Sequence, residues 1–539
     1  EFAYPEGKIG KVSRTVIDAF EEQVRRTPQR GALIYKDVNY TYEELNNRIN
    51  QLAWHLMECG IKGGSIVPVI SHRTDNMLIA LYAILKCGAA YSMIDTEFPK
   101  ERIDGIIDDY EPLVVIIGDD EYVPDQKYTV LKLSDENNYS DRTDNLGICI
   151  GENDIAYLTS TSGTTGKPKS VMCPHGGVMS YVEAFTRYFG INENTVALQH
   201  TSYGFDTIVE EVFPAHITGG KVVLYPEAHM IDFEVAKKVI AENGVTFISC
   251  STLLLNEMNR NNMPTCVKLY VNGGDKLEYH HIDNLIKTAK IGNTFGPTEA
   301  TVCFALAYVD EENKKAPIGR PIYGREVYII QNGNLCGIGV PGEICVAGSG
   351  ISAGYYKREE LTKEKFEKNP YGEGRLYHTG DLGRWLPNGE IDFLGRIDDQ
   401  VKIRGYRVEL KEVEAVIMQE ANVKVAVVVA KAVTANEKKL VAYIQGTGNE
   451  KIDISVLKSK IRKKLPEYMV PQAYMQLESI PTKENGKVDK SALPEVEIKA
   501  AREYVAPKTE KEKQICRIIS EILDVKEVGV NDNFFELGG

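Results

Sequence analysis

A polar stretch with glycines, TSTSGTTGKPKS from Thr159 to Ser170, has the residue types that bind phosphate. Glycines let backbone N–H groups turn inward, hydroxyls donate hydrogen bonds, and two lysines supply positive charge. A Walker loop is excluded, because only two residues separate Gly163 from Gly166 where that pattern needs four. The stretch therefore predicts a phosphate-binding loop of another class, with a solvated loop as the alternative.

Other polar clusters with a glycine turn follow later in the chain. Each cluster alone is also typical of an ordinary turn or a solvated edge. A functional role therefore requires that the clusters come together in the fold. They are NTFGPTEAT (293–301), YHTGDLGRW (377–385), GRIDDQVKIRGYRVEL (395–410) and NGKVDK (485–490).

Composition limits the class of protein. A chain of 539 residues is expected to form two or more domains. A net charge of −14 argues against a nucleic-acid-binding surface. No apolar run has the length of a membrane span and no signal-peptide pattern is present, so we expect a cytoplasmic protein without a membrane partner. Ten cysteines without a C-x-x-C pair favour reduced core thiols over disulfides or a zinc site.

The elements that must position these clusters alternate between helix and strand. Thr41 and Glu44 form a capping-box pattern, leucines and isoleucines then repeat at helical spacing, and Gly60 follows as a helix-ending glycine. Such alternation predicts layered α/β sheets with mostly parallel strands, a β-rich texture from about 320 and an α+β pattern over about 400–495. The expected strands include 65–70, 113–118, 221–226, 246–251 and 268–274.

The end of the sequence differs from the rest. Residues 496–508 are charged and predict a linker, and Thr509 with Glu512 caps a following helix. One amphipathic helix cannot bury its apolar stripe alone, so 509–539 is expected to be the start of a small helical domain, cut short. The stripe consists of Ile515, Ile518, Ile519, Ile522 and Leu523.

Taken together, the clusters over about residues 15–495 closely resemble the adenylate-forming enzymes, specifically the adenylation domains of nonribosomal peptide synthetases. Further motifs that carry the resemblance are YTYEEL (40–45), LKCGAAYSMID (85–95), GFDT (204–207), GEICVAGSGISAGYY (342–356) and LPEYMVP (465–471). The tail is similar to the first part of a peptidyl carrier domain, without its attachment serine.

The resemblance implies an α/β fold: a large N-terminal domain of layered α/β sheets with a β-rich subdomain, then a small mobile α+β domain and a partial helical carrier tail. The implied ranges are 1–397 for the adenylation core, 398–495 for the C-terminal subdomain, 496–508 for the linker and 509–539 for the carrier. It also implies a ligase of antibiotic biosynthesis that converts ATP to AMP and pyrophosphate, forms aminoacyl-AMP, and transfers the amino acid to a phosphopantetheine thiol.

The same resemblance assigns roles around ATP and Mg²⁺. Lys487, Thr298 and Glu299 are the expected catalytic residues: Lys487 bridges the substrate carboxylate and the nucleotide, Thr298 contacts the α-phosphate, and Glu299 holds Mg²⁺. Asp398 is the expected hinge of the small C-terminal domain. One orientation brings Lys487 into the site for adenylation, and the other withdraws it and presents the KIRGYR segment to the incoming thiol. Ser170 stands where the family usually has glycine, and Phe295 where it more often has tyrosine. The expected nucleotide contacts are Thr161, Ser162, Gly163, Thr164, Thr165, Gly166 and Lys169 at the phosphates, Phe295 at adenine, and Asp381 and Arg396 at the ribose.

Alignment on the motifs also predicts an amino-acid pocket. Asp206 would pair with the α-ammonium group of the substrate. A buried carboxylate at Glu210 requires a cationic partner, and the small remaining lining predicts lysine, with ornithine next. Alternatively, Glu210 pairs with an internal Lys or Arg or faces outward, and Glu211 takes its place if the register slips. The full lining is Asp206, Thr207, Glu210, Thr252, Val271, Gly273, Thr294, Val302, Cys303 and Lys487.

Two other functions remain open at this point. One is another adenylate-forming enzyme, namely an acyl-CoA or aryl-CoA ligase or a luciferase-like oxidase, and the other is a non-catalytic scaffold module. The expected partners are the amino-acid substrate, a peptidyl carrier domain, neighbouring synthetase domains and, as an open alternative, a small helper protein.

Overall fold

A computed structural model shows that the chain divides into two compact units. Unit one comprises the described residues up to Val408, and unit two those from Glu409 onward. The ranges predicted for the individual domains remain predictions. The structure describes residues 14–118, 122–124, 127–163, 168–227, 231–312, 314–403, 405–432, 438–448, 451–482, 488–496, 506–523, 525 and 528–530.

The largest sheet of unit one is parallel in its centre and antiparallel at both edges. Its neighbours pair in parallel from β13 through β12, β11, β9 and β10 to β1, whereas β14, β15 and β2 add antiparallel edges. In spatial order the strands are β15 (Arg320–Pro321), β14 (Ala305–Tyr308), β13 (Lys290–Phe295), β12 (Leu269–Gly273), β11 (Phe247–Ser251), β9 (Val196–Gln199), β10 (Lys221–Leu224), β1 (Gly31–Tyr35) and β2 (Val38–Thr41).

A second sheet of unit one carries the phosphate-binding stretch. It is parallel from β7 to β6 and antiparallel where β7, β8 and β19 pair. Its strands in spatial order are β19 (Gly354–Tyr355), β8 (Lys169–Pro174), β7 (Ile155–Thr161), β4 (Ala90–Ile94), β3 (Ile66–Ile70), β5 (Val114–Ile117) and β6 (Thr129–Lys132).

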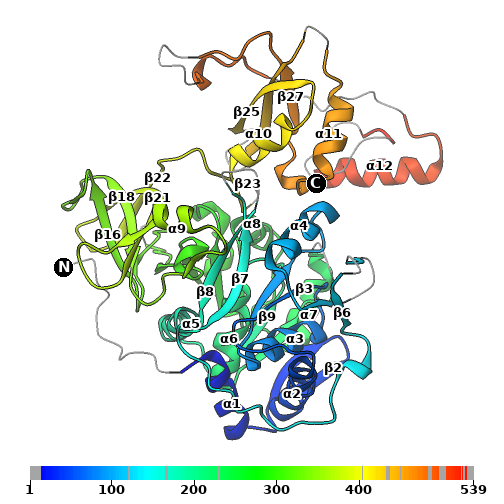
Figure 1. The fold of residues 1–539 in the computed structure, drawn as a ribbon, viewed down its shortest axis with the longest axis vertical. Helices are drawn as coiled ribbons and strands as arrows, with labels where there is room; N and C mark the ends of the chain where they lie inside the picture. Colours follow the sequence, from blue (N-terminus) through cyan, green and yellow to red (C-terminus); the bar gives the residue numbers. More distant parts are fainter. Residues whose placement is uncertain are drawn as a thin grey trace. The chain divides into compact units, whose positions relative to one another are not determined.

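The β-rich part of unit one is antiparallel throughout its described strands (Figure 1). It contains β17 (Asn334–Leu335), β16 (Glu326–Gln331), β18 (Gly342–Ala347), β21 (Arg375–Trp385) and β20 (Phe366–Lys368), with β22 (Ile391–Arg396) beside β21. A two-stranded hairpin of β23 (Val401–Ile403) and β24 (Tyr406–Val408) ends the unit.

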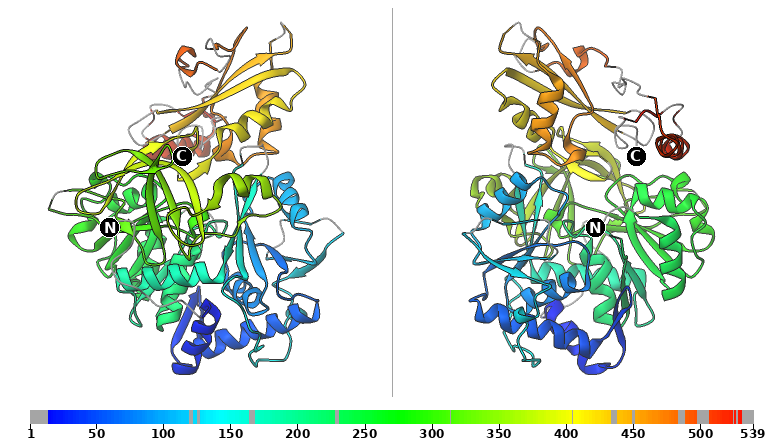
Figure 2. Two further views of the ribbon diagram at one scale, coloured as in Figure 1. Left: turned by 60° about the vertical axis from the view of Figure 1, so that its left-hand side comes forward. Right: turned by 90° about the vertical axis from the view of Figure 1, so that its right-hand side faces the viewer.

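The helices of unit one connect these strands and cover the sheets. Helix α6 packs against β9, β10 and α5, and α5 packs in turn against β7 and β8, so the two large sheets sandwich this helical pair. The right-hand view of Figure 2 shows the blue and the green strands on either side of the teal helices. The helices are α1 (Val16–Arg26), α2 (Tyr42–Glu58), α3 (Asp75–Lys86), α4 (Lys100–Tyr110), α5 (His175–Phe189), α6 (Ile208–Thr218), α7 (Phe233–Asn243), α8 (Thr252–Arg260) and α9 (Glu359–Lys365); short 3₁₀ turns are η1 (Glu136–Asn138), η2 (Tyr279–His281), η3 (Leu285–Lys287) and η4 (Thr298–Ala300).

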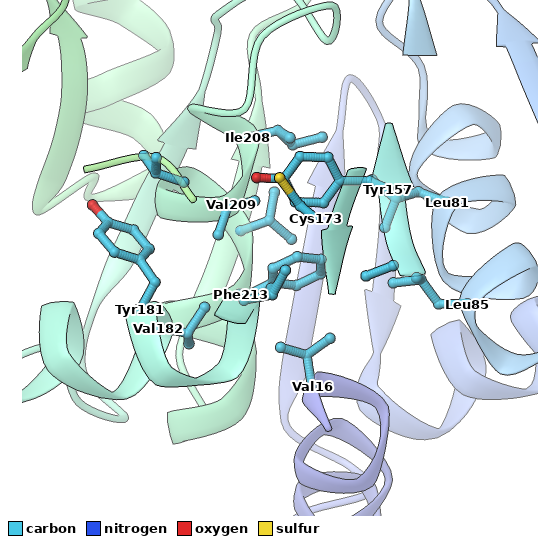
Figure 3. Close-up of a cluster of buried hydrophobic side chains, with 14 of the residues drawn as sticks. Val16, Leu81, Leu85, Tyr157, Cys173, Tyr181, Val182, Ile208, Val209 and Phe213 are labelled. Atoms are coloured by element: carbon cyan, nitrogen blue, oxygen red, sulfur yellow. The ribbon is translucent and has the colours of Figure 1, made fainter. Parts of the chain in front are cut away.

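One apolar core joins the two large sheets through these helices. Phe213 of α6 packs among Val16 of α1, Leu85 of α3 and Tyr157 of β7, all fully or almost fully buried (Figure 3). Each such side chain contributes about 1.5–3 kcal/mol by its burial. Tyr181 of α5 differs, because its hydroxyl points away from the apolar cluster (Figure 3). The core therefore fixes α5 and α6 rigidly, and with them the polar groups that these helices carry.

Unit two contains an α+β fold. Its sheet pairs β25 (Val423–Ala432) with β26 (Lys438–Gly446) antiparallel and β26 with β27 (Ala473–Gln476) in parallel. Its helical elements are α10 (Leu410–Met418), α11 (Ile454–Arg462), α12 (Glu510–Leu523), η5 (Glu467–Met469) and η6 (Lys490–Ala492). Helix α12 begins at the predicted capping box of Thr509 and Glu512. Its residues Ile515, Ile518 and Ile522 are exposed.

The local sequence patterns predicted several elements of unit one correctly. The Thr41–Glu44 capping box is formed, α2 follows it, and Gly60 has the positive φ of a helix-ending glycine. All ten cysteines are free thiols. Within the described ranges, no helix combines the length and the apolar character needed to cross a membrane.

Candidate functional site

The predicted phosphate-binding stretch joins two antiparallel strands. Strand β7 ends at Thr161 and β8 begins at Lys169, so both ends of the loop are held in one sheet. Ser162 donates a hydrogen bond to the carbonyl oxygen of Arg407 at 3.0 Å. The predicted contacts Thr164, Thr165 and Gly166 lie outside the described residues.

Ser170, where the family usually has glycine, fits its strand without a positive φ. Its hydroxyl lies 2.7 Å from the Tyr110 hydroxyl and 3.1 Å from that of Ser160. The extra side chain is therefore used in a hydroxyl cluster between β7, β8 and α4, and it does not distort the strand backbone there.

Glu299 lies at the centre of a buried charged cluster. It is fully buried, its Oε1 accepts a hydrogen bond from Tyr355 at 2.8 Å and lies 3.7 Å from Lys169 Nζ, and its Oε2 lies 2.8 Å from Arg407 Nη1. Burial raises the pKa of Glu299, but Arg407, Lys169 and Tyr355 outweigh burial and lower the pKa to about 2. Glu299 is thus ionised at neutral pH, and an ionised carboxylate suits Mg²⁺.

The predicted ribose and hinge residues are connected by one guanidinium group. Arg396 Nη1 lies 2.8 Å from Asp381 Oδ1, while its Nε and Nη2 lie 2.9 and 2.6 Å from the carboxylate oxygens of Asp398. Arg396 also donates to the carbonyl oxygen of Thr379 at 2.9 Å. The pairing of β21 with β22 places Asp381 opposite Arg396. A hydroxyl group that donates to Asp381 would therefore share this carboxylate with the same arginine that holds Asp398.

Phe295, predicted to contact adenine, ends strand β13 within an aromatic group. Its ring lies 5.5 Å from that of Phe304 and 5.0 Å from that of Phe393 between centroids, and Lys402 Nζ lies 5.8 Å from its centroid. These contacts fix the ring orientation. The predicted catalytic Lys487 lies outside the described residues.

Glu210 lies in the interior and has two hydroxyl partners. Tyr181 donates to its Oε1, and Ser249 donates to its Oε2 at 2.7 Å. Burial raises the pKa of Glu210 to about 7. Among the described residues no Lys or Arg forms an ion pair with this carboxylate, and it does not face outward. Both alternatives considered for Glu210 therefore lack support.

The neighbouring Glu211 is saturated by donors from its own surroundings. Its two oxygens accept hydrogen bonds from Gln199 at 2.8 Å, from the Thr201 hydroxyl at 2.6 Å, and from the backbone N–H groups of His200 and Thr201 at 3.2 Å. Every acceptor position is occupied by the protein. Glu210, with only two hydroxyl donors, is accordingly the carboxylate with capacity for a ligand.

Asp206 has a buried carboxylate oxygen without a donor. Its Oδ2 accepts no hydrogen bond in the described part of the chain. Burial raises its pKa to about 6, while hydrogen bonds from the Thr298 hydroxyl and the Val302 backbone act in the opposite direction. An orphaned buried acceptor costs about 1–3 kcal/mol, so a cationic ligand at this oxygen would remove a penalty already present in the fold.

The other predicted pocket residues are distributed unevenly around Glu210. Cys303 Sγ lies 3.6 Å from the Tyr181 hydroxyl, and Val271 is paired with Ser249 across β11 and β12. A Cβ added to Gly273 would lie 3.0 Å from Thr294 Oγ1, so glycine there keeps space beside that hydroxyl.

Two predicted pocket residues direct their hydroxyls elsewhere. Thr207 precedes α6 and donates to Thr201 at 3.2 Å. Thr252 begins α8 and donates to Asn272 Oδ1 at 2.8 Å and to the Asp275 carbonyl at 3.1 Å. The hydroxyl that does reach Glu210 is that of Ser249, which was not among the predicted pocket residues.

The turn after Glu299 is strained. Thr301 and Val302 have φ of 51° and 68°, a region that β-branched residues avoid. The fully buried Arg325 donates to the carbonyl oxygens of Ala300 at 3.1 Å and Thr301 at 3.4 Å. This guanidinium group holds the turn that connects the charged cluster to the predicted pocket.

Sequence reasoning did not identify the residues that support these side chains. Tyr355 and Arg407 lie within quoted motifs, so their motif membership was a usable signal. Ser249 follows the strand alternation that places it opposite Val271. Tyr181 lies in an ordinary helix pattern and Arg325 directly precedes a strand, and only the tertiary structure identifies them.

Comparison with known proteins gives matches over the whole chain. Residues 20–356 match the family model described as AMP-binding enzyme, and residues 412–487 match the AMP-binding enzyme C-terminal domain. Bacitracin synthase 2 of Bacillus licheniformis is 39% identical over 538 residues, covering 98% of this chain and 20% of that protein. This chain thus spans about a fifth of the length of that curated relative.

Two solved structures share the fold. One is a nonribosomal peptide synthetase protein containing adenylation and PCP domains, bound to a vinylsulfonamide inhibitor; it has 24% identity and a TM-score of 0.82, covering 98% of this chain and 90% of the other. The second is a four-domain nonribosomal peptide synthetase bound to AMP and glycine, with 30% identity and a TM-score of 0.67, covering 99% of this chain and 40% of the other. The predicted fold class, with a large N-terminal and a smaller C-terminal domain, is confirmed.

Proposed function

The chain belongs to the AMP-binding enzyme family, and we propose that it activates an amino acid with ATP as aminoacyl-AMP and transfers it to the phosphopantetheine thiol of a carrier domain. The single observation that carries the choice of an amino acid is Asp206 Oδ2, a buried carboxylate oxygen without a donor. A substrate α-ammonium group would supply the missing charge and hydrogen bond. A free fatty or aryl acid has no such group, and its carboxylate would meet the Asp206 carboxylate unfavourably.

The nucleotide is proposed to bind at the buried charged cluster and the adjacent strand ends. Thr298 contacts Asp206 and directly precedes Glu299 in η4, so the substrate carboxylate and the α-phosphorus could meet beside it. Lys169 and the loop residues from Thr161 to Gly166 would hold the departing phosphates, with Phe295, Asp381 and Arg396 on the nucleoside. Glu299 would hold Mg²⁺, which when bound neutralises charge on the phosphates. Lys487 would bridge the two anions as they approach.

Glu210 supports lysine as the preferred substrate. Its carboxylate is buried, carries no protein cation among the described residues, and is surrounded by the small or polar Ser249 and Cys303. A long, slim side chain that ends in an ammonium group would complete this arrangement. Ornithine, one methylene shorter, would leave the ion pair stretched and should be the weaker substrate.

Transfer to a carrier is supported by the domain composition of similar solved structures. One solved neighbour is described as containing adenylation and PCP domains, and the second as a four-domain nonribosomal peptide synthetase. We propose the same type of carrier partner here, with neighbouring synthetase domains, and rotation about Asp398 between the two half-reactions.

ATP–pyrophosphate exchange across the common amino acids, ornithine, norleucine and representative aryl and fatty acids tests the proposal. We expect lysine to give the highest rate and ornithine the next. An apolar or acidic amino acid as the best substrate would refute the lysine assignment alone. Exchange with free acids but not with amino acids would refute the amino-acid assignment, and absence of ATP binding would favour a scaffold module.

Two variants separate the roles of the acidic residues. Asp206→Asn should impair every amino acid, because all share the α-ammonium group. Glu210→Gln should impair lysine by roughly two to four orders of magnitude, since removing one partner of a buried pair costs about 3–5 kcal/mol. Norleucine should gain relative to lysine in Glu210→Gln but not in Asp206→Asn.

A further inference from the structure

Three different metal-ligand types meet in the β-rich part of unit one, on strands apart from the predicted pocket. They are Glu343 and Cys345 of β18 and His378 of β21, whose ligand atoms all lie within 4.8 Å of one another. His378 Nδ1 lies 2.9 Å from Glu343 Oε2 and 3.5 Å from Cys345 Sγ. A carboxylate oxygen, a thiol sulfur and an imidazole nitrogen are the donors that Zn²⁺ takes in proteins.

The sheet register explains why these side chains converge. Cys345 and His378 are direct cross-strand partners, and Glu343 lies two residues before Cys345, on the same face. On the next strand Glu367 is paired with Leu376, two residues before His378. Its Oε1 lies 3.0 Å from His378 Nε2. One face of three adjacent strands thus presents the three ligands and a carboxylate behind the imidazole.

Burial and spacing both suit a metal ion. Cys345 is fully buried, whereas the Glu343 and His378 side chains are 25% and 28% exposed, which leaves a path for an ion and a water. Ligand atoms around a tetrahedral ion at about 2.0–2.3 Å lie roughly 3.3–3.8 Å apart. The distances of 2.9 and 3.5 Å at His378 Nδ1 need only small side-chain shifts to reach that spacing.

We propose that Glu343, Cys345 and His378 form a binding site for a divalent transition metal, best suited to Zn²⁺, with water as the fourth ligand. Cys345 binds as the thiolate and His378 through the Nδ1 lone pair, so the thiol proton and the Nδ1 proton that faces Glu343 are both released to solvent. Glu367 is a positioning residue: it holds the imidazole so that Nδ1 faces the ion, as carboxylates commonly do behind metal-bound histidines.

The site also contacts the strand that carries Asp381. Glu343 Oε1 accepts a hydrogen bond from the Gly380 N–H at 3.0 Å, and Thr379 donates to the Ile344 carbonyl at 2.7 Å. Glu343 can therefore bind an ion through Oε2 and keep its backbone contact through Oε1. Occupancy by metal should brace this bulged part of β21 against β18.

A competing explanation is a purely ionic role, in which a protonated His378 bridges Glu343 and Glu367 and the thiol of Cys345 is incidental. The two explanations differ in their response to Co²⁺, since only the metal site places a thiolate on the ion. Co²⁺ bound by Cys, His and Glu gives a near-ultraviolet thiolate-to-metal absorption and visible bands of a tetrahedral ion.

The test uses the full chain without an affinity tag, treated with a chelator and free of nucleotide. Titration with Co²⁺ should give the thiolate absorption at one ion per chain, and Zn²⁺ should abolish it. Cys345→Ser should remove the absorption and weaken Zn²⁺ binding, measured by calorimetry, by more than about 100-fold, and Glu367→Gln should weaken it by about 10–100-fold. Cys149→Ser, at an exposed cysteine, is the matched control and should bind as the wild type does.

His378→Arg provides a second comparison, because arginine keeps a cation between the two carboxylates but removes the metal ligand. It should fold normally and bind no Co²⁺ at this site. Co²⁺ titration of the wild type without a thiolate absorption would overturn the proposal, as would unchanged Zn²⁺ affinity in Cys345→Ser. Either result would assign the cluster to the ionic explanation.

Discussion

Arg407 Nη1 lies 2.8 Å from Glu299 Oε2, so an arginine of the β23–β24 hairpin occupies an oxygen of the carboxylate proposed to hold Mg²⁺. The Glu299 side chain is fully buried and that of Arg407 is 19% exposed. A metal ion bound at this oxygen would therefore have to displace the arginine. The KIRGYR segment, which contains Arg407, thereby contacts the carboxylate proposed to hold Mg²⁺.

Removal of this arginine should ease Mg²⁺ binding. In Arg407→Ala, the Mg²⁺ concentration for half-maximal ATP–pyrophosphate exchange should fall by roughly fivefold, corresponding to about 1 kcal/mol of lost competition. Arg384→Ala is the matched control, because Arg384 pairs with Asp392 at the surface. An unchanged or increased Mg²⁺ requirement in Arg407→Ala would show that the two cations do not compete at Glu299.

The preference for lysine should depend on pH through Glu210. Burial raises its pKa to about 7, so below that pH the carboxyl is mostly neutral and cannot pair with the lysine ammonium group. The ratio of kcat/KM for lysine to that for norleucine should rise from pH 6 to pH 8, by up to about tenfold per unit below the pKa. Because both substrates meet Asp206 alike, the ratio isolates Glu210. Glu210→Gln should make the ratio independent of pH, and a pH-independent ratio in the wild type would contradict the pairing.

The buried Glu210 carboxyl should lower the free energy of unfolding at pH values above the ordinary pKa of glutamate. Folded Glu210 keeps its proton up to about pH 7, whereas the unfolded residue loses it near 4.5, so the free energy of unfolding falls as pH rises between these values. Without substrate, Glu210→Gln should therefore gain stability relative to the wild type from pH 4.5 to pH 8, by on the order of 3 kcal/mol at most. Chemical denaturation at the two pH values measures this difference. A larger relative gain at the lower pH would have the wrong sign.

Lys487 should be required for adenylation and not for folding. Lys487→Ala should lower the rate of ATP–pyrophosphate exchange by about 10²–10³, the usual cost of removing one group that stabilises developing charge. The melting temperature and much of the ATP affinity should remain. Lys490→Ala, a nearby lysine outside the proposed machinery, should retain activity. Near wild-type exchange in Lys487→Ala would remove this residue from the reaction.

Proline at position 398 should separate the two half-reactions. Proline fixes φ, so Asp398→Pro should impair transfer to a phosphopantetheinylated carrier, supplied separately, more than it impairs adenylation. Asp398→Ala loses the same contacts with Arg396 without restricting φ, and it should affect both half-reactions in proportion. Equal losses in Asp398→Pro and Asp398→Ala would argue against a hinge.

Much of the fold follows from local patterns in the sequence. The Thr41–Glu44 capping box and the helix-ending Gly60 are short-range features, and the structure confirms both. Apolar runs such as 246–251 predicted buried strands, because a few consecutive apolar residues are enough to indicate a strand that is buried in a sheet. The ordered motifs similarly identified the family, since each motif is a contiguous stretch of sequence.

The sequence by itself determined the family, the fold class and the identity of the charged residues, because these depend on residue types and short spacings. It did not determine which side chains meet across distant segments. The Ser249 and Tyr181 hydroxyls that contact Glu210, and the Arg407–Glu299 pair, depend on the packing of separate strands and helices. The surroundings also decided the protonation of two buried glutamates, Glu210 and Glu299, which share one residue type but differ in pKa. At Glu210, two hydroxyl donors do not offset the rise in pKa that burial causes. At Glu299, Arg407, Lys169 and the Tyr355 hydroxyl together outweigh that rise and lower the pKa.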